Sequence, residues 1–225
     1  SINRNFSAPV IIEAERSSDE LERLAQADND PFARYEAMQE LMMRALVAGA
    51  RGQQLDSAPV TRTIGATLKS NSLDPAFKAE AILLPSESLI ADRLDVVDPD
   101  AIHKAREQLR SEIGTALHGE LLAAHRSDGV SGDDLSPAAK GVRRLRTVSL
   151  GFIAAADEHQ AAALAKAQFD RADNMTDRQG ALGVLVSTDT EERQQALGAF
   201  YERFHDDPLV LDKWFALQAA AQRRD

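Results

Sequence analysis

The chain has 225 residues, enough for one large domain or two small ones, and it contains no cysteine, which excludes disulfides and thiolate metal sites. Its 36 acidic and 26 basic residues give a net charge of −10; because such a surface repels a phosphate backbone, we expect no nucleic-acid partner. The sequence has no run of about 18 apolar residues and no visible signal peptide, so we expect no membrane partner and a cytoplasmic location.

The first 13 residues differ in pattern from the rest of the chain. The β-branched residues Val10, Ile11 and Ile12 follow Pro9, which cannot donate a hydrogen bond to a sheet ladder. This pattern favours a short edge strand or an extended lead-in over residues 1–13. Because a single strand is not stable alone, we expect it to pair with strands absent from this chain or to lie along the helices.

From Ser17 onward the apolar spacing is helical. The first half has capping residues, several of them followed by proline at the first helical position, which predicts helix starts at Ser17 or Ser18, Asp30-Pro31, Ala58, Asp74-Pro75, Ser86 and Asp98-Pro99. The helix from Asp98-Pro99 is predicted to be the longest and to run to His125, because its apolar residues recur mainly at intervals of three, four or seven.

The second half begins with a turn-rich acidic loop over residues 127–134. Further helices are predicted to start at Ser136-Pro137, His159, Asn174, Glu191 and Asp207-Pro208. Helices joined by short loops form antiparallel neighbours. The sequence therefore predicts an all-α body of antiparallel helix hairpins stacked as an α-α superhelix of the HEAT or armadillo kind, preceded by a short β-strand.

A weak internal similarity fits this stack. A basic residue, an alanine three positions later and then a large apolar residue recur near Arg34, Arg178 and Lys213. Chance similarity among alanine-rich helices explains it equally well.

The sequence offers no candidate catalytic, cofactor-binding or metal-binding residue. The His-Glu-x-x-His spacing of helical zinc sites is absent, as are a Gly-x-Ser-x-Gly elbow, a P-loop and a Gly-x-Gly-x-x-Gly turn. His118 and His125 are seven residues apart and could share a helix face. We expect both to be structural rather than metal ligands.

Other polar clusters have simpler structural interpretations. We expect the basic group Lys140, Arg143, Arg144 and Arg146 to be solvated or salt-bridged rather than an anion site. We expect the loop from Asp128 to Asp134 to be a solvated turn. The pairs Glu191-Glu192 and Asp206-Asp207 lie where helices start, and we expect them to stabilise the helix dipole.

Large apolar residues at helical spacing are expected in the core. This applies to Met38, Met42 and Met43, and to Trp214 and Phe215, for which interface anchoring is the alternative.

Several blocks resemble the bacterial aminopeptidase N (alanyl aminopeptidase) family, in the same order along the chain. They are Ser1 to Val10, Asn29-Asp30 with Arg34, Leu83 to Ser86, Asp98 to Ile102, Gln168-Phe169 with Ala172 to Asp177, and Leu209 to Phe215. The resemblance covers essentially the whole chain. It implies that residues 1–13 end a β-sandwich domain and that residues 14–225 are a C-terminal helical domain, incomplete at its C-terminal end.

The resemblance further implies a zinc-dependent exopeptidase that removes N-terminal amino acids from peptides. Its zinc and substrate-amine motifs would lie upstream of Ser1, so no catalytic or metal residue is assigned to this chain, and the fragment alone is predicted to be inactive. The implied partners are the catalytic and β-sandwich domains of the same polypeptide and, in the intact enzyme, peptide substrates. The implied role of the helices is to enclose the active-site cavity and limit access.

The alternative is an independent helical-repeat scaffold that binds other proteins. Such a scaffold should end in polar capping repeats. An incomplete domain should instead expose an apolar patch near residues 6–12 or on the C-terminal helix, where further segments would pack.

Overall fold

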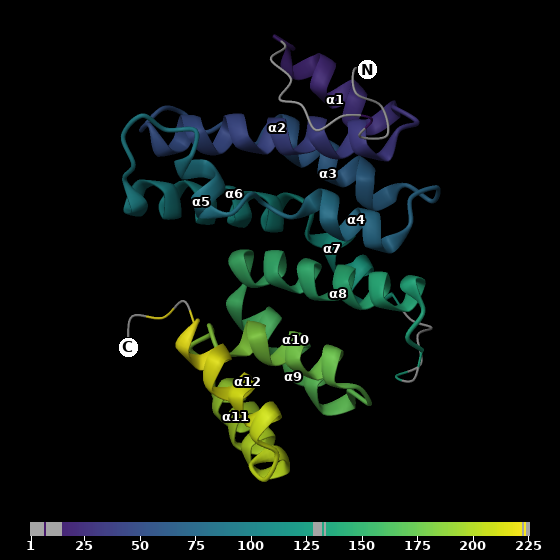
Figure 1. The fold of residues 1–225 in the computed structure, drawn as a ribbon, viewed down its shortest axis with the longest axis vertical. Helices are drawn as coiled ribbons and strands as arrows, with labels where there is room; N and C mark the ends of the chain where they lie inside the picture. The colour runs from purple at the N-terminus through teal and green to yellow at the C-terminus, as the bar shows by residue number, and fades with distance from the viewer. Residues whose placement is uncertain (1–6, 8–14, 128–131, 133, 222, 224–225) are drawn as a thin grey trace. The chain divides into compact units, whose positions relative to one another are not determined.

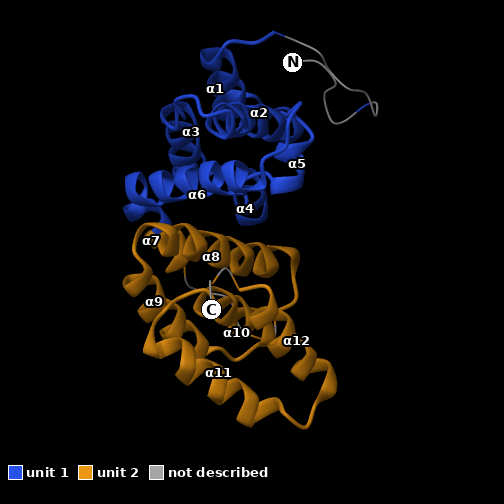
Figure 2. Ribbon diagram, turned by 90° about the vertical axis from the view of Figure 1, so that its left-hand side faces the viewer, with its two compact units in different colours: residues 1–121 blue, residues 122–225 orange. Residues whose placement is uncertain are grey.

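The computed structural model describes residues 7, 15–127, 132, 134–221 and 223, and every regular element among them is a helix (Figure 1). The chain divides into two compact units, residues 1–121 and residues 122–225 (Figure 2). The strand expected over residues 1–13 lies outside the described residues, apart from Ser7, which belongs to no regular element. None of the described helices is both long and apolar enough to span a membrane.

Unit 1 is built around one long helix, α2, which packs against five others of that unit. The helices of unit 1 are α1 (Ser18–Ala27), α2 (Pro31–Ala50), α3 (Ala58–Lys69), α4 (Pro75–Ile82), α5 (Glu87–Ala91) and α6 (Pro99–Ala116). The buried face of α2 includes Met38, Met42 and Leu46, each at most 1 % exposed. Met38 and Met42 are therefore core residues as predicted, whereas Met43 is half-buried.

The helix starts in unit 1 follow the capping chemistry of the sequence. Ser17 caps α1 in a capping box, in which Glu20 N–H donates to Ser17 Oγ and Ser17 N–H donates to the Glu20 carboxylate. Asp30, Asp74 and Asp98 each accept a backbone N–H at the start of a helix whose first residue is proline. After α2 the chain turns at Gly52, whose φ of 73° is accessible to glycine at little cost.

The long helix predicted from Pro99 to His125 is two helices, and that prediction was wrong. Helix α6 ends at Ala116, Leu117 leaves the helical conformation with φ −112° and ψ 24°, and α7 (His118–His125) follows. Leu117 is 7 % exposed and packs close to Gly65 of α3, where an added Cβ would lie 3.1 Å from Leu117 Cδ2. The interruption thus lets Leu117 fill a position against α3 that the helix pattern did not reveal.

Unit 2 contains the end of α7 and five further helices. These are α8 (Pro137–Ala156), α9 (Glu158–Arg171), α10 (Met175–Leu185), α11 (Glu191–Phe204) and α12 (Pro208–Ala219). Helices α8, α9 and α10 pack against one another, α11 packs against α9 and α10, and α12 packs against α11. Helices α10 and α11 each pack against the two helices before them, which is the arrangement of stacked helical repeats.

Candidate functional site

The most distinctive polar feature of the described residues is a buried ion-pair network inside unit 2. Arg146 Nη1 of α8 lies 3.0 Å from Asp177 Oδ1 of α10, and Arg143 Nε lies 3.8 Å from Asp177 Oδ2. Arg143 is 3 % exposed and Asp177 is 7 % exposed. Such charges are found in a protein interior when they are paired and hydrogen-bonded.

Each member of this network has further hydrogen-bond partners. Asp177 Oδ2 accepts from Asn174 Nδ2 at 3.0 Å, and the Asp177 carbonyl accepts from Gln168 Nε2 of α9 at 2.8 Å. Asn174 is also the N-cap of α10, where its side chain accepts from Asp177 N–H. The network therefore connects three helices of unit 2 at the point where α10 begins.

The two arginines also bind backbone carbonyls that precede α8. Arg143 donates to the Asp134 carbonyl at 2.8 Å and to the Gly132 carbonyl at 3.3 Å, and Arg146 donates to the Ser127 carbonyl at 2.9 Å. Most of the loop over residues 128–134, predicted to be a solvated turn, lies outside the described residues.

The basic group predicted from the sequence thus divides into two pairs. Arg143, which is buried, and Arg146, which is part-buried, are salt-bridged to Asp177, one of the two expected arrangements; Lys140 and Arg144 are exposed. Since the buried pair already binds a carboxylate and three carbonyls, we interpret it as structural and not as an anion site.

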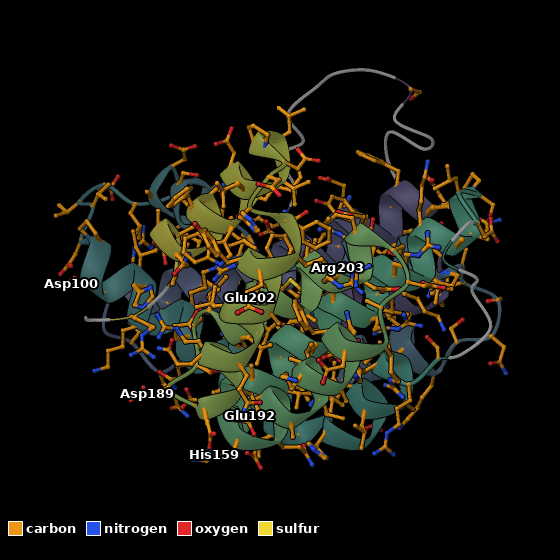
Figure 3. All side chains as sticks on the ribbon, turned by 90° about the horizontal axis from the view of Figure 1, so that it is seen from below. Asp100, His159, Asp189, Glu192, Glu202 and Arg203 are labelled. Carbon is orange, nitrogen blue, oxygen red and sulfur yellow. The ribbon has the colours of Figure 1, made fainter. Side chains whose placement is uncertain are left out.

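The described histidines and carboxylates do not come together as a metal site. Within the described ranges, no group of three or more His, Asp or Glu side chains could hold a metal ion. His125 is buried at 5 % exposure, His118 is half-buried, and His159 is exposed and lies on the same side of the view as Asp189 and Glu192 in Figure 3. Glu158 accepts the backbone N–H of Asp189, which gives it a structural contact between α9 and the turn before α11.

Three of the four paired carboxylates lie at helix starts as expected, whereas Asp206 lies 3.4 Å from His205 Nε2 after the end of α11. Asp207 caps α12 by accepting from the backbone N–H groups of Leu209 and Val210. Glu191 and Glu192 lie in the first turn of α11, where negative charge is favourable.

The second notable feature is the α12 surface, which we define as Tyr201 of α11 with Leu209, Trp214 and Phe215 of α12. No residue of α12 is buried, although half of its residues are large and apolar. Leu209 is 78 % exposed and Phe215 is 56 % exposed. The prediction that Phe215 is a core residue was therefore wrong, and the C-terminal helix exposes large apolar side chains, in line with the expectation for this helix.

Aromatic contacts order this surface. Trp214 Nε1 donates to the Leu197 carbonyl of α11 at 3.0 Å, and the Trp214 ring lies 5.3 Å from the Tyr201 ring and 5.0 Å from the Phe215 ring. The part-buried Trp214 is anchored on α11, and Phe215 extends from it toward solvent. A rigid aromatic group with an exposed apolar edge is typical of a surface that another helix covers.

Comparison with known proteins decides the family. A family profile described as "Domain of unknown function (DUF3458_C) ARM repeats" matches residues 18–225. The chain belongs to this family. The ARM-repeat description agrees with the stacked helices of each unit and with the predicted all-α class.

The chain is also similar to curated aminopeptidases and to a solved aminopeptidase structure. The aminopeptidase N of Escherichia coli (strain K12) is 34 % identical over 221 residues, and that of Caulobacter vibrioides is 35 % identical over 219 residues. Each match covers 96 % of this chain and 25 % of the relative. A solved structure of Legionella pneumophila aminopeptidase A in complex with aspartic acid matches 98 % of this chain and 27 % of its own, with a TM-score of 0.81 and 27 % identity.

The chain therefore spans about a quarter of the length of the curated relatives it matches. It is homologous to the C-terminal helical domain of aminopeptidase N-like enzymes, which confirms the resemblance seen in the sequence.

Proposed function

We propose that this chain is the non-catalytic helical domain of an aminopeptidase N-like zinc exopeptidase that removes N-terminal amino acids from peptides in the cytoplasm. The observation that carries the proposal is the match of nearly the whole chain to one quarter of two aminopeptidases N, at 34 % and 35 % identity. The fold match at a TM-score of 0.81 supports the same assignment from the backbone alone.

The described residues do not fit a zinc ion, since they contain no group of three metal-binding side chains. We therefore assign zinc and the reacting groups to the other domains of the parent polypeptide, which are the partners of this chain, and we derive no catalytic step from the helices described above.

The division of the chain is part of the proposal. Residues 1–13 would close a β-sandwich domain, and residues 14–225 would form a helical domain that continues beyond α12 as an α-α superhelix. The exposed apolar face of α12 supports this continuation. A further helix that covered Leu209 and Phe215 would remove their apolar surface from water, at about 25 cal/mol for each Å² buried.

The proposed role is to enclose the active-site cavity and to limit access to it. A stack of helix pairs suits this role, because each repeat packs on its neighbours and the stack can present a rigid curved surface without reactive groups. Such a wall would admit short peptides and exclude folded proteins.

Catalytic inactivity of the chain is tested with the purified 225 residues and aminoacyl reporter substrates, with and without added zinc. We expect no turnover above the buffer rate. Zinc-dependent turnover that co-purifies with the chain through successive columns would contradict the proposal.

The access role is tested in the intact polypeptide with two substrates that share one N-terminal sequence, a short free peptide and the same sequence fused to a stably folded domain. We expect only the free peptide to be processed efficiently. We expect Asp177→Asn to weaken the interior of unit 2 and so to narrow the difference in processing between the free peptide and the fused substrate. The exposed-site control Asp170→Asn should leave this difference unchanged. Equal processing of both substrates by the unmodified enzyme would contradict the access role.

The alternative function is an independent helical scaffold, which the apolar α12 surface also favours as a partner-binding site. The two functions are distinguished by mixing the isolated chain with separate partner proteins and measuring binding. A scaffold would bind separate partner proteins through Phe215 when no aminopeptidase domains are attached, whereas the proposed domain should have this surface covered within its own polypeptide.

A further inference from the structure

His125 is a buried titratable side chain for which the proposed function has no use. It is the last residue of α7 and is 5 % exposed. Its ring is hydrogen-bonded to the backbone of Arg146, and among the described residues its Nδ1 atom has no hydrogen-bond partner. A protonated imidazole carries N–H groups on both nitrogens, so protonation would place a buried donor at Nδ1 without an acceptor.

Among the described residues, the charges that act on the pKa of His125 are positive. Arg146 of α8, Arg171 of α9 and the adjacent Arg126 all act on the ring. The carboxylate that α10 contributes, Asp177, is already bound by Arg146 and Arg143.

Burial is the main cause that lowers the pKa of His125 below its ordinary value of 6.5. The three arginine charges lower the pKa further, and the hydrogen bond to the Arg146 backbone opposes them in part. The unfolded chain therefore binds the proton more readily than the folded chain. The contribution of neutral His125 to stability is fully present above about pH 6.5 and is lost as the pH falls toward the lowered pKa.

The same arginine holds the chain that follows His125. Arg146 Nη2 donates to the Ser127 carbonyl at 2.9 Å, and Ser127 Oγ donates to the Ala124 carbonyl at 2.8 Å. Arg146 therefore attaches the end of α7 to α8 at two points. Its backbone binds the His125 ring, and its side chain binds the Ser127 carbonyl. A positive charge on His125 would repel the guanidinium that makes this attachment.

We propose that His125 is an acid-sensitive latch, whose neutral ring holds residues 122–127 on α8 and whose protonation loosens them. The inference is independent of the proposed function, because it rests on contacts within unit 2. In neutral solution the latch is closed, and acidification opens it locally before the rest of the unit unfolds.

The first test is an NMR titration of the histidine ring protons in the 225-residue chain. We expect His125 to titrate below 6.5, and we expect Arg126→Gln to raise its midpoint, because this exposed arginine contributes charge without contributing to the core. A His125 midpoint at or above 6.5 would overturn the proposal, as would an unchanged midpoint in Arg126→Gln.

The second test is amide hydrogen exchange of residues 122–127, corrected for intrinsic rates, between about pH 7.5 and about pH 5.5. In the unmodified chain the opening equilibrium should rise on acidification, by at most about tenfold per pH unit because one proton is taken up. His125→Asn should abolish the rise, and His159→Asn, at an exposed site, should retain it. An equal rise in the unmodified chain and in His125→Asn would overturn the latch. If His125→Asn does not fold, the ring titration and Arg126→Gln decide the matter alone.

Discussion

Arg146 and Asp177 form a part-buried ion pair between α8 and α10, with Nη1 and Oδ1 3.0 Å apart. Thirty-one residues separate them in the chain, and Arg143 binds the same carboxylate from one turn earlier on α8. The pair supports the packing of these two helices, because an unpaired charge at this depth would be strongly unfavourable.

Replacing the acidic member should therefore destabilise unit 2. Asp177→Asn leaves the buried Arg143 and the part-buried Arg146 without a counter-charge, and we expect it to reduce the free energy of unfolding by about 3 kcal/mol. Urea denaturation checks the value. The control is Asp170→Asn, which removes an exposed ion pair with Lys166 and should change stability by less than about 0.5 kcal/mol. Equal effects at the two sites would show that the buried network is not a main support of the unit.

A glycine sets the distance between α8 and α10. A Cβ at Gly180 would lie 2.6 Å from Thr147 Oγ1, whereas a Cβ at Gly183, one turn later, would lie 3.6 Å from Leu217 Cδ2. We expect Gly180→Ala to destabilise the chain by about 1–3 kcal/mol and Gly183→Ala to be neutral or stabilising by up to about 1 kcal/mol. The double variant Gly180→Ala with Thr147→Ala should recover part of the loss. Thermal unfolding of the four proteins tests the contact, and identical shifts for both alanines would contradict it.

The capping box of α1 makes a pH-dependent contribution. The backbone hydrogen bond from Ser17 is the largest cause that lowers the pKa of Glu20 below its ordinary value of 4.5. Because the folded pKa is lowered, this contribution is present above about pH 4.5 and is lost as the pH falls through the lowered pKa. Ser17→Gly retains the backbone N–H but removes the hydroxyl, and it should raise the Glu20 midpoint only in part. NMR titration of the Glu20 carboxyl measures both midpoints, and a Glu20 midpoint at or above 4.5 in the unmodified chain would refute the effect.

The aromatic residues of α11 and α12 should respond very differently to truncation. Phe200 is 1 % exposed and Phe215 is 56 % exposed. Phe200→Ala should therefore cost about 3–5 kcal/mol, and Phe215→Ala should cost less than about 1 kcal/mol in the 225-residue chain. In the longer parent polypeptide, where we propose that a further helix covers α12, Phe215→Ala should become markedly more destabilising. A small effect in both contexts would argue that the α12 surface stays open.

Most of the helix starts could be predicted from the sequence, because they depend on local chemistry. Three helices start where a side-chain acceptor precedes a proline, whose backbone has no N–H group to be paired. These starts are Asp98-Pro99, Ser136-Pro137 and Asp207-Pro208. The all-α class followed from the same signals.

The errors arose where tertiary contacts outweigh local pattern. Leu117 fits the helical spacing of its neighbours, and its departure from the helix reflects the space beside Gly65, which is 52 residues earlier in the chain. Phe215 has the spacing of a core residue, and whether it is buried depends on what packs against α12. The pairing of Arg143 and Arg146 with Asp177 could not be predicted either, since the spacing of charges in sequence does not specify which helices meet.

The most direct test of the central claim is the sequence of the gene upstream of the codon for Ser1. If these helices form the non-catalytic domain of a zinc exopeptidase, the same reading frame should encode a His-Glu-x-x-His motif before this segment. A gene whose coding sequence begins at this segment, or an upstream frame that encodes no such zinc motif, would contradict the account.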